Sequence, residues 1–375
     1  MPDKDPDSPA PSTLIQVSED PCCREASLPS LDTWLTPVER FYVRNHFSNI
    51  PQLDTATWRL TVEGEANTPL GLSYDELTRL PHTTVVATLE CAGNSRSALV
   101  PPGEGLAFRH GAVSTAAWRG VSLRRILLQA GMKETAQAVL FEGADIGSEE
   151  EEGQSFELAY QRSLPLEKAL HPETLLAYAM NGTTLTPAHG FPLRLVVPGW
   201  YGMASVKWLV QVRVLDRPFD GFFQGRRYVF LNEGGTSEAP PEPVAVLRVK
   251  SLITRPRMGE VLPPGAYTIR GFAWSGAGHI HTVEVSTNGG RHWQVTTLSG
   301  TPVPNAWRPW EFPWQVSTLG RVILMARATD TAGNTQPSMA PWNYRGYANN
   351  SIHVVPVEVA SGRFQGEAPE PKGPR

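Results

Sequence analysis

Cysteine is scarce in this chain of 375 residues, which contains only Cys22, Cys23 and Cys91. Three cysteines, two of them adjacent, do not form the disulfide framework that holds small secreted domains together. The same count excludes a Cys-x-x-Cys-His haem attachment and a four-cysteine iron–sulfur site. The sequence also shows no flavin fingerprint, so we expect neither haem nor flavin as a cofactor.

Long hydrophobic runs are also missing. No run approaches the length of about 20 apolar residues that a transmembrane helix needs. The start, Met1-Pro-Asp-Lys-Asp-Pro-Asp-Ser-Pro, has neither the apolar core of a secretory signal nor an Arg-Arg pair. These features predict a cytoplasmic protein without a membrane span, or a periplasmic one if a signal has been removed.

Basic residues are not in excess, since the formal net charge is −4. Electrostatics therefore gives no reason to expect nucleic acid as a partner. Hydrophobic residues make up 41% of the chain, which supports a sizeable core. Because 375 residues exceed what a single core usually serves, we expect two domains.

The first half has the pattern of an α+β domain. Helices are expected at 73–80, where Ser73 and Glu76 form a capping box, and at 121–131, where Gly131 ends the helix. Strands are expected at 58–62, 175–180, 193–197 and 206–214.

After a segment rich in Gly, Pro and Glu, the hydrophobic period changes to two. Short strands are expected near 246–253, 266–274, 281–286, 293–298, 310–316, 322–328 and 352–359. This number of strands, with a hairpin turn at 288–290, fits an immunoglobulin-like sandwich. We therefore divide the chain into a disordered leader (1–30), an α+β domain (31–235), a linker (236–243), an all-β sandwich (244–359) and a flexible tail (360–375).

Cys91 lies in the most informative stretch, Leu89-Glu90-Cys91-Ala92-Gly93-Asn94-Ser95-Arg96. The preceding segment, 83–89, is β-branched and apolar and predicts a buried strand. A strand that delivers a thiol to a loop beside Arg96 favours the thiolate, which binds soft metals or attacks electrophiles. A buried structural thiol is the ordinary alternative, and these residues alone leave both interpretations open.

Further polar clusters interrupt the apolar pattern. Segment 41–46 places a guanidinium, an amide and an imidazole in succession, either to bind a ligand or as a solvated loop. Segment 189–194 is a turn with a His and an Arg that suit phosphate, although turn histidines are often simply exposed. Segment 198–207 either cradles an anion or only joins two strands. Segments 226–228 and 342–346 combine arginine with tyrosine, a pattern that is common on surfaces.

Taken together and in this order, these segments resemble the sulfite oxidase family of molybdenum enzymes. The resemblance rests on Phe-x-x-Arg-Asn-His, Leu-Glu-Cys-Ala-Gly-Asn-x-Arg, His-Gly-Phe-Pro-x-Arg, Val-Lys-Trp-Leu and Trp-Asn-x-Arg-Gly, and covers residues 35–359. It implies that the domain 31–235 binds one molybdenum-molybdopterin per chain and is catalytic. It also implies that the sandwich is a dimerisation domain and that the thiolate of Cys91 ligates molybdenum.

The resemblance further implies roles for individual residues. The expected catalytic residues, which surround the metal and bind the substrate anion, are Arg44, Cys91, Arg96, Tyr228 and Arg345. The expected cofactor-binding residues are Tyr42, Val43, Arg44, Asn45, His46, Cys91, Asp145, His189, Arg194, Ser205, Val206 and Lys207. Cys91 is the expected metal ligand.

Some positions depart from the pattern of the animal enzymes. Glu104 and Phe108 stand where those enzymes have lysine and tryptophan near the substrate, and Ser95 replaces an arginine. These changes lower the positive charge of the expected pocket. Sulfite remains the expected substrate, while its affinity, and even the identity of the substrate, stay open.

The implied activity is the oxidation of sulfite to sulfate by oxygen-atom transfer, with electrons passed to a separate acceptor such as a cytochrome or oxygen. The alternatives are a related molybdoenzyme that acts on nitrate or an S-oxide, and a non-enzymatic scaffold. A scaffold would be expected to lose Cys91 or the arginines, which are all present. A homodimer is expected, because Trp307, Trp310 and Trp314 would give the sandwich apolar surface to cover.

Overall fold

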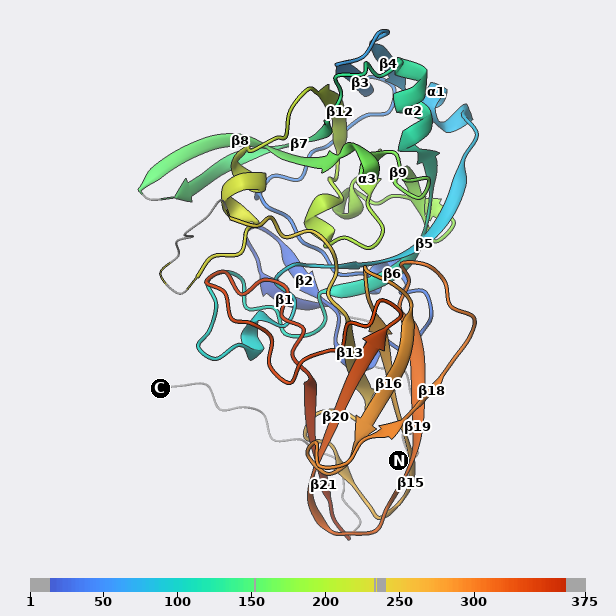
Figure 1. Cartoon of the computed structure of the whole chain (residues 1–375), viewed down its shortest axis with the longest axis vertical. Coiled ribbons are helices and arrows are strands. Elements are labelled where there is room, and N and C mark those ends of the chain that lie inside the picture. The colour runs from blue at the N-terminus through green and yellow to red at the C-terminus, as the bar shows by residue number, and fades with distance from the viewer. Residues whose placement is uncertain (1–13, 152, 233, 235–240, 362–375) are drawn as a thin grey trace.

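The computed structural model describes residues 14–361, except Glu152, Glu233 and 235–240. Figure 1 shows a mixed upper part formed by the first half of the chain and an elongated lower sandwich formed by the second half. Strands make up most of the regular structure. Among the described residues, no helix has the length and apolar character needed to cross a membrane.

Two five-stranded sheets organise the first domain. One has the order β4-β3-β12-β7-β8, in which β12 and β3 are parallel and the other pairs are antiparallel. The other has the order β10-β9-β6-β5, with β11 beside β9. The strands are β3 (Arg59–Gly64), β4 (Leu70–Ser73), β5 (Thr83–Glu90), β6 (Val113–Ser122), β7 (Ala138–Glu151), β8 (Gln154–Pro165), β9 (Leu175–Met180), β10 (Thr183–Thr184), β11 (Arg194–Val196) and β12 (Leu209–Leu215).

Short helices connect these strands. The capping box expected before α1 is confirmed, because the Ser73 hydroxyl accepts from the Glu76 N–H and the Glu76 carboxylate accepts from the Ser73 N–H. The second expected helix ends at Gly131, whose φ of 66° is left-handed. The α-helices are α1 (Tyr74–Arg79), α2 (Leu123–Ala130) and α3 (Leu166–Ala169). The single turns are η1 (Leu28–Ser30), η2 (Val38–Arg40), η3 (Arg96–Ala98), η4 (Pro187–His189), η5 (Gly202–Ala204) and the π-type η6 (Phe222–Arg227).

The second domain is the expected immunoglobulin-like sandwich. Its sheets have the orders β13-β15-β19-β18 and β14-β21-β20-β16-β17. The strands are β13 (Lys250–Arg255), β14 (Val261–Leu262), β15 (Gly265–Trp274), β16 (Ile280–Ser286), β17 (Gln294–Val295), β18 (Thr297–Leu298), β19 (Arg308–Val316), β20 (Gly320–Asp330) and β21 (His353–Val359). The expected turn lies between β16 and β17, where Gly289 and Gly290 have φ of 70° and 88°.

The hydrophobic core continues from one domain into the other. Trp307 stacks on Phe272 with ring centroids 4.2 Å apart, and its indole N–H donates to the Trp34 carbonyl at 2.8 Å. Trp307, Trp310 and Trp314 are all buried within the chain. The expectation that these tryptophans need a partner subunit to cover them is therefore wrong, because the facing sheet and the first domain already cover them.

The expected disordered leader is wrong for residues 14–30. Two antiparallel strands form there, β1 (Ile15–Ser18) and β2 (Cys23–Glu25), and Arg24 pairs with Val43 through backbone hydrogen bonds. The Glu25 carboxylate, 1% exposed, accepts from the N–H groups of Arg109 and Gly111. These long-range partners hold a segment whose composition is that of a loose chain. Residues 1–13, most of the expected linker and the tail from 362 onward lie outside the described residues.

A long hairpin, β7–β8, was not predicted from the sequence. It extends to the left in Figure 1, away from the body of the first domain. The second half of β7 carries Glu149 and Glu150, and such an acidic run hides the alternation that marks a strand. The hairpin matters for the site, since both glutamates line one of the pockets described below.

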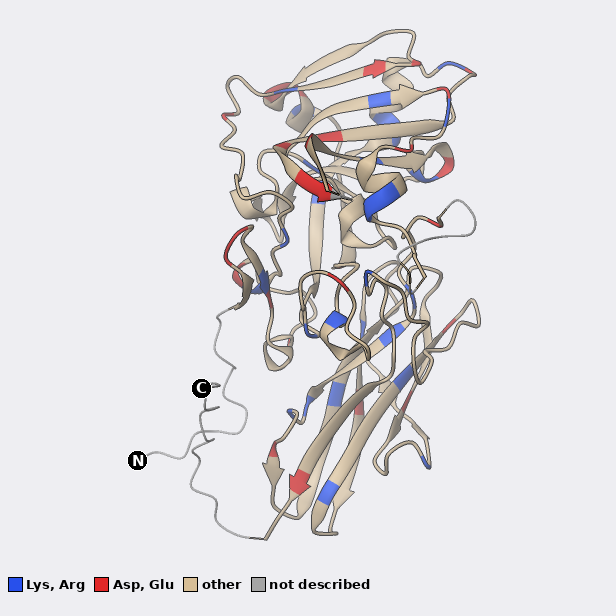
Figure 2. Ribbon diagram, turned by 90° about the vertical axis from the view of Figure 1, so that its left-hand side faces the viewer, with Lys and Arg blue, Asp and Glu red and all other residues tan. Residues whose placement is uncertain are grey.

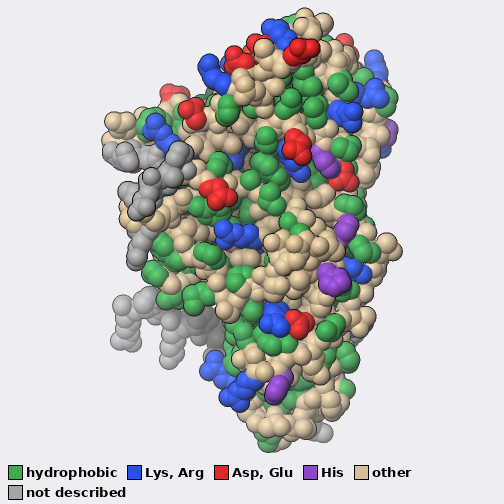
Figure 3. Space-filling view, in the orientation of Figure 1, with side chains coloured by type: hydrophobic (Ala, Val, Ile, Leu, Met, Phe, Trp, Pro, Cys, Tyr) green, Lys and Arg blue, Asp and Glu red, His purple; other side chains and the backbone are tan. Residues whose placement is uncertain are grey.

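Charged residues of both signs are interspersed over both domains (Figure 2). The face shown in Figure 3 likewise has no extended area of one sign. Strong attraction for a small anion must therefore come from charges gathered inside a pocket.

Asp330, at the end of β20, generates a prediction about the stability of the sandwich. Its carboxylate accepts from the Ser275 hydroxyl at 2.7 Å and from the N–H groups of Ala332 and Asn334 at 3.0 and 2.9 Å. Burial raises the pKa of Asp330, but the hydrogen bonds from Asn334 and Ser275 outweigh this and hold it below its ordinary value. The carboxylate thus contributes stability that is fully present above pH about 4 and is lost as pH falls through the lower folded pKa.

We expect Asp330→Ala to lower the free energy of unfolding of the sandwich by about 1–3 kcal/mol at pH 7, because buried donors lose their acceptor. The difference in free energy of unfolding between the variant and the parent protein should be smaller at pH 3, where Asp330 begins to be protonated. Thermal unfolding over a pH series measures it. An equal difference at pH 3 and pH 7 would show that the ionised carboxylate is not responsible.

Candidate active site

Two pockets meet around the end of β5. The inner pocket is lined by first-domain residues, including nine of the twelve expected cofactor-binding residues. The outer pocket is lined by all five expected catalytic residues, including Arg345 from the second domain. The two pockets share Arg44, His46, Cys91 and Tyr228. A ligand in one pocket would therefore reach a ligand in the other at these four residues.

Cys91 follows the last residue of β5 and is 9% exposed. Its N–H donates to the Ala112 carbonyl at 2.9 Å, which fixes the start of the loop. Burial raises the pKa of the Cys91 thiol, and the opposing effects of Arg44, the Gly93 N–H and Arg96 do not reverse that direction. The expectation that these surroundings alone favour the thiolate is wrong. A bound metal cation would supply the missing stabilisation.

The Arg96 side chain lines the outer pocket and is held there by hydrogen bonds to backbone carbonyls. Its Nε donates to the Arg345 carbonyl at 2.8 Å and its Nη1 to the Leu106 carbonyl at 2.6 Å. Its guanidinium lies 5.2 Å from the centre of the Tyr347 ring. A Cβ atom on Gly93 would come within 2.7 Å of Arg96 Nη1, so the small residue beside Cys91 is what gives the guanidinium its room.

The outer pocket is rich in arginine but formally balanced in charge. Its cations are Arg44, Arg96, Arg227 and Arg345, and its anions are Asp20, Glu104, Glu149 and Glu150, which is four against four. Glu104 lies 3.8 Å from Arg345, and Glu149 lies 3.7 Å from Arg227. The Glu104 side chain is 51% exposed and that of Arg345 9%, so the carboxylate sits nearer the solvent than the guanidinium.

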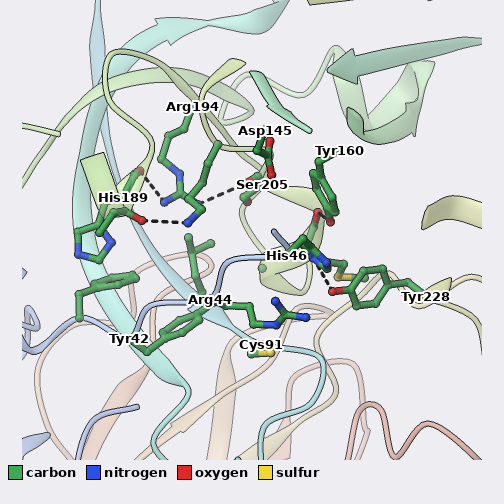
Figure 4. Close-up of a pocket in the computed structure, with 16 residues that line it drawn as sticks. Tyr42, Arg44, His46, Cys91, Asp145, Tyr160, His189, Arg194, Ser205 and Tyr228 are labelled. Carbon is green, nitrogen blue, oxygen red and sulfur yellow. Dashed lines mark hydrogen bonds between the residues drawn. The ribbon is translucent and has the colours of Figure 1, made fainter. Parts of the chain in front are cut away.

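Tyr228 and His46 form a hydrogen-bonded pair between the two pockets (Figure 4). The phenolic oxygen lies 2.8 Å from His46 Nε2, and the imidazole stacks on Tyr160 at 4.4 Å. Burial, together with the charge of Arg44, lowers the pKa of His46 well below its ordinary value. Burial raises the pKa of Tyr228. The pair is therefore a neutral phenol and a neutral imidazole.

The far end of the inner pocket holds two basic side chains, Arg194, which is buried, and Lys207, which is partly buried. Arg194 donates to the carbonyls of His189 and Ser205 at 3.0 and 3.2 Å, as the dashed lines in Figure 4 show. Lys207 Nζ donates to the Ala188 carbonyl at 2.9 Å and to the Asn45 side chain. Burial lowers the pKa of both cations. An anionic group such as a phosphate would compensate both charges.

Asp145 provides an acceptor in the same pocket. Its carboxylate is buried, and among the described residues Oδ1 has no hydrogen-bond partner. Burial raises the pKa of Asp145, and the charge of Lys207 opposes that effect. A buried acceptor without a partner costs free energy unless a ligand donates to it. The pocket therefore offers a cationic end for a phosphate and an acceptor for N–H groups, which fits a phosphorylated pterin.

Three expected cofactor-binding residues do not line either pocket. Val43 is paired with Arg24 through its backbone, and the Val206 carbonyl accepts from Leu195 N–H at 2.8 Å. The Asn45 side chain donates to the Cys22 carbonyl at 3.0 Å and accepts from Lys207. Contacts within the chain occupy these groups, so they position neighbours that face the pocket.

Other lining residues were missed by the sequence analysis. Tyr160 lies on β8 of the unpredicted hairpin, so no local pattern pointed to it. Tyr347 lies one residue beyond segment 342–346, and that proximity was an available signal. Among the described residues, no group of three or more His, Cys, Asp or Glu could hold a metal. Cys91 therefore belongs to no such cluster in the described part of the chain.

Comparisons with known proteins agree with this geometry. Residues 46–223 match the oxidoreductase molybdopterin binding domain, and residues 242–360 match the Mo-co oxidoreductase dimerisation domain. The chain is 40% identical to the sulfite oxidase of Gallus gallus over 343 residues, covering 86% of this chain and 72% of that protein. It is 40% identical to the mitochondrial sulfite oxidase of Homo sapiens over 349 residues, covering 88% of this chain and 62% of that protein.

More distant relatives belong to neighbouring activities. The NADH nitrate reductase of Ulva prolifera is 33% identical over 373 residues, which cover 91% of this chain and 43% of that protein. The crystal structure of the sulfane dehydrogenase SoxCD from Paracoccus pantotrophus superposes with a TM-score of 0.80 at 28% identity. That superposition covers 92% of this chain and 88% of the other.

The position of Cys91 predicts the effect of replacing its sulfur. We expect Cys91→Ser to fold like the parent but to lose turnover, because a hydroxyl is a harder and weaker donor than a thiolate toward a soft metal. Circular dichroism and thermal unfolding check the fold, and metal analysis with steady-state assays checks the site. Full turnover by a serine variant carrying the metal would show that Cys91 is not its ligand.

Proposed function

Because the chain belongs to the sulfite oxidase family of molybdopterin-dependent oxidoreductases, we propose that it oxidises sulfite to sulfate at a molybdenum centre bound by Cys91. The observation that carries the proposal is the meeting of the two pockets at this residue. The inner pocket has the charges and acceptor that suit a phosphorylated pterin, and the outer pocket has the arginines that suit a small oxyanion.

The residues that would hold the cofactor follow from the inner pocket. Arg194 and Lys207 would bind its phosphate, with His189 and Ser205 at the same end. Asp145 would accept from pterin N–H groups through its Oδ1. When bound, the molybdenum centre supplies the oxygen atom that sulfite gains and takes up the two electrons that sulfite loses.

Three arginines would bind and orient the sulfite anion. Arg44, Arg96 and Arg345 all line the outer pocket beside Cys91. Arg96 and Arg345 are nearly buried, at 6% and 7% exposure, so water screens their charges poorly. Charge-assisted hydrogen bonds from fixed guanidinium groups would hold the sulfur lone pair toward the metal and lower the entropic cost of reaction.

Tyr228 and His46 would take part in proton transfer and hydrogen bonding during the reaction. Overall, sulfite and one water give sulfate, two protons and two electrons, so protons must leave the site. Tyr228 holds its proton at the phenolic oxygen and can donate a hydrogen bond to the bound anion or to His46 Nε2. The neutral imidazole can accept the hydrogen bond of the Tyr228 hydroxyl at Nε2, and its lowered pKa means that it would quickly pass on a proton rather than keep it.

The partners of the reaction are part of the proposal. The two electrons would pass to a separate acceptor, a cytochrome or oxygen, and the cytoplasm remains the predicted compartment. The dimerisation domain supports a homodimer. Light scattering should therefore give twice the chain mass of 41.1 kDa. A fully active monomer at micromolar concentration would contradict this.

The balanced charge of the outer pocket favours a second possibility for the substrate. Because four carboxylates offset four arginines, the pocket attracts a dianion less strongly than the arginines alone would. A less charged sulfur compound, or another small oxyanion or S-oxide, is therefore the alternative substrate class.

One experiment separates these possibilities. The purified protein is analysed for molybdenum and pterin, and then assayed with sulfite, nitrate and an S-oxide using artificial electron carriers. We expect one molybdenum per chain and reduction of ferricyanide that depends on sulfite. Protein without molybdenum would contradict the cofactor assignment, whereas loaded protein that turns over only nitrate or the S-oxide would contradict the substrate.

Substitutions of Arg345 and of Glu104 are expected to change the kinetics with sulfite in opposite directions. Arg345→Met should lower kcat/KM for sulfite roughly ten- to hundredfold, because losing a charge-assisted contact costs about 1.5–3 kcal/mol. Glu104→Gln should lower KM by at most about fivefold, because a half-exposed ion pair contributes about 0–1 kcal/mol. Steady-state kinetics at low and high salt measure both variants. A parent-like Arg345→Met enzyme would remove this arginine from the anion site.

A further inference from the structure

The loop from Glu90 to Arg96 is hydrogen-bonded to the second domain near both of its ends. The Ala92 carbonyl accepts from the Ala348 N–H at 2.8 Å. At its other end, Arg96 Nε donates to the Arg345 carbonyl at 2.8 Å. The sandwich thus contacts the backbone just after Cys91 and the side chain of the substrate-facing arginine.

A buried ion pair lies beneath this loop. Lys250, at the start of β13, donates through Nζ to the Glu90 carboxylate at 2.9 Å, and both residues are 1% exposed. The same carboxylate accepts from Trp274 Nε1 at 2.8 Å and from Asn94 Nδ2 at 2.9 Å. Glu90 is thus held by the second domain and the loop at once, and it is bonded directly to Cys91 in the chain.

Ser95 is the other partner of Lys250. Its φ of 69° lies in the left-handed region, which a residue with a side chain adopts only when its surroundings hold it there. Its hydroxyl lies 2.8 Å from Lys250 Nζ and 2.8 Å from His110 Nδ1. Its carbonyl accepts from Asn349 Nδ2 at 2.8 Å. These contacts fix the turn that places Arg96 beside Gly93.

A buried ion pair is weak support for a purely stabilising role, because taking both charges out of water offsets much of their attraction. The bonds of Lys250 go to the residue before Cys91 and the residue before Arg96. We propose that Lys250 is a positioning residue, through which the sandwich domain sets the place of the metal-binding thiol and the substrate-binding guanidinium. The second domain is then part of the catalytic scaffold as well as a dimerisation module. The kinetic part of this inference rests on the proposed function.

Two variants test the proposal in the molybdenum-loaded, full-length protein. Lys250→Met combined with Glu90→Gln removes both charges, so no lone charge stays buried. Ser95→Gly removes the hydroxyl, while glycine adopts the left-handed conformation without strain. Glu173→Ala is the matched control, since it removes another hydrogen bond between the domains, from Asn305 Nδ2 at 2.8 Å, away from the loop.

We expect kcat/KM per bound molybdenum to fall at least about tenfold in both test variants, because small misplacements of reacting groups are costly. One loop carries both groups, so kcat should fall and KM should rise together. The visible absorption of the oxidised protein, to which the thiolate-to-metal bond contributes, should shift. Glu173→Ala should leave kinetics and absorption unchanged.

The proposal is overturned if Ser95→Gly folds and retains the parent's absorption and kcat/KM within about twofold. If the double variant does not fold, the kinetics and absorption of Ser95→Gly alone test the proposal. If the parent binds molybdenum but does not oxidise sulfite, the proposed substrate is wrong, and the absorption of the variants still tests the positioning role.

Discussion

The ion pair between Glu90 and Lys250 is the contact on which the arrangement of the site depends. It joins the end of β5 to the start of β13, and Trp274 and Asn94 complete the bonding of the carboxylate. The hydrophobic core that continues from one domain into the other includes Ala92 and Trp274, which are close to this pair in the chain or bonded to it. Because the pair is buried, it ties the Cys91 loop to the second domain, which also contributes Arg345 to the outer pocket.

The charges of the two pockets explain why they suit different ligands. In the inner pocket Arg194 and Lys207 donate to backbone and amide oxygens, and both would neutralise a fixed phosphate. In the outer pocket, Glu104 and Glu149 lie near arginines, so the field that a mobile anion meets is weaker. This difference in charge suits the two ligands, because the cofactor must stay bound whereas the product of the substrate must leave.

Much of the fold could be predicted from the sequence, because local patterns carried it. The capping box at Ser73, the turn at Gly289 and the alternation along the sandwich strands each reflect short-range preferences. The ordered hairpin at 15–25 and the β7–β8 hairpin could not be predicted, since distant partners hold the first and an acidic run masks the second. The site residues could be predicted from sequence motifs. The raised pKa of Cys91 could not, because it depends on burial, which no motif shows.

We expect one metal to lie where the two pockets meet, bound to the chain through Cys91. Crystallography of the purified protein, with anomalous diffraction recorded on both sides of the molybdenum absorption edge, tests this most directly. We expect a single molybdenum peak per chain within bonding distance of Cys91 Sγ, with pterin density running toward Asp145 and Arg194. A peak bound to other side chains, or pterin density that avoids the inner pocket, would contradict it.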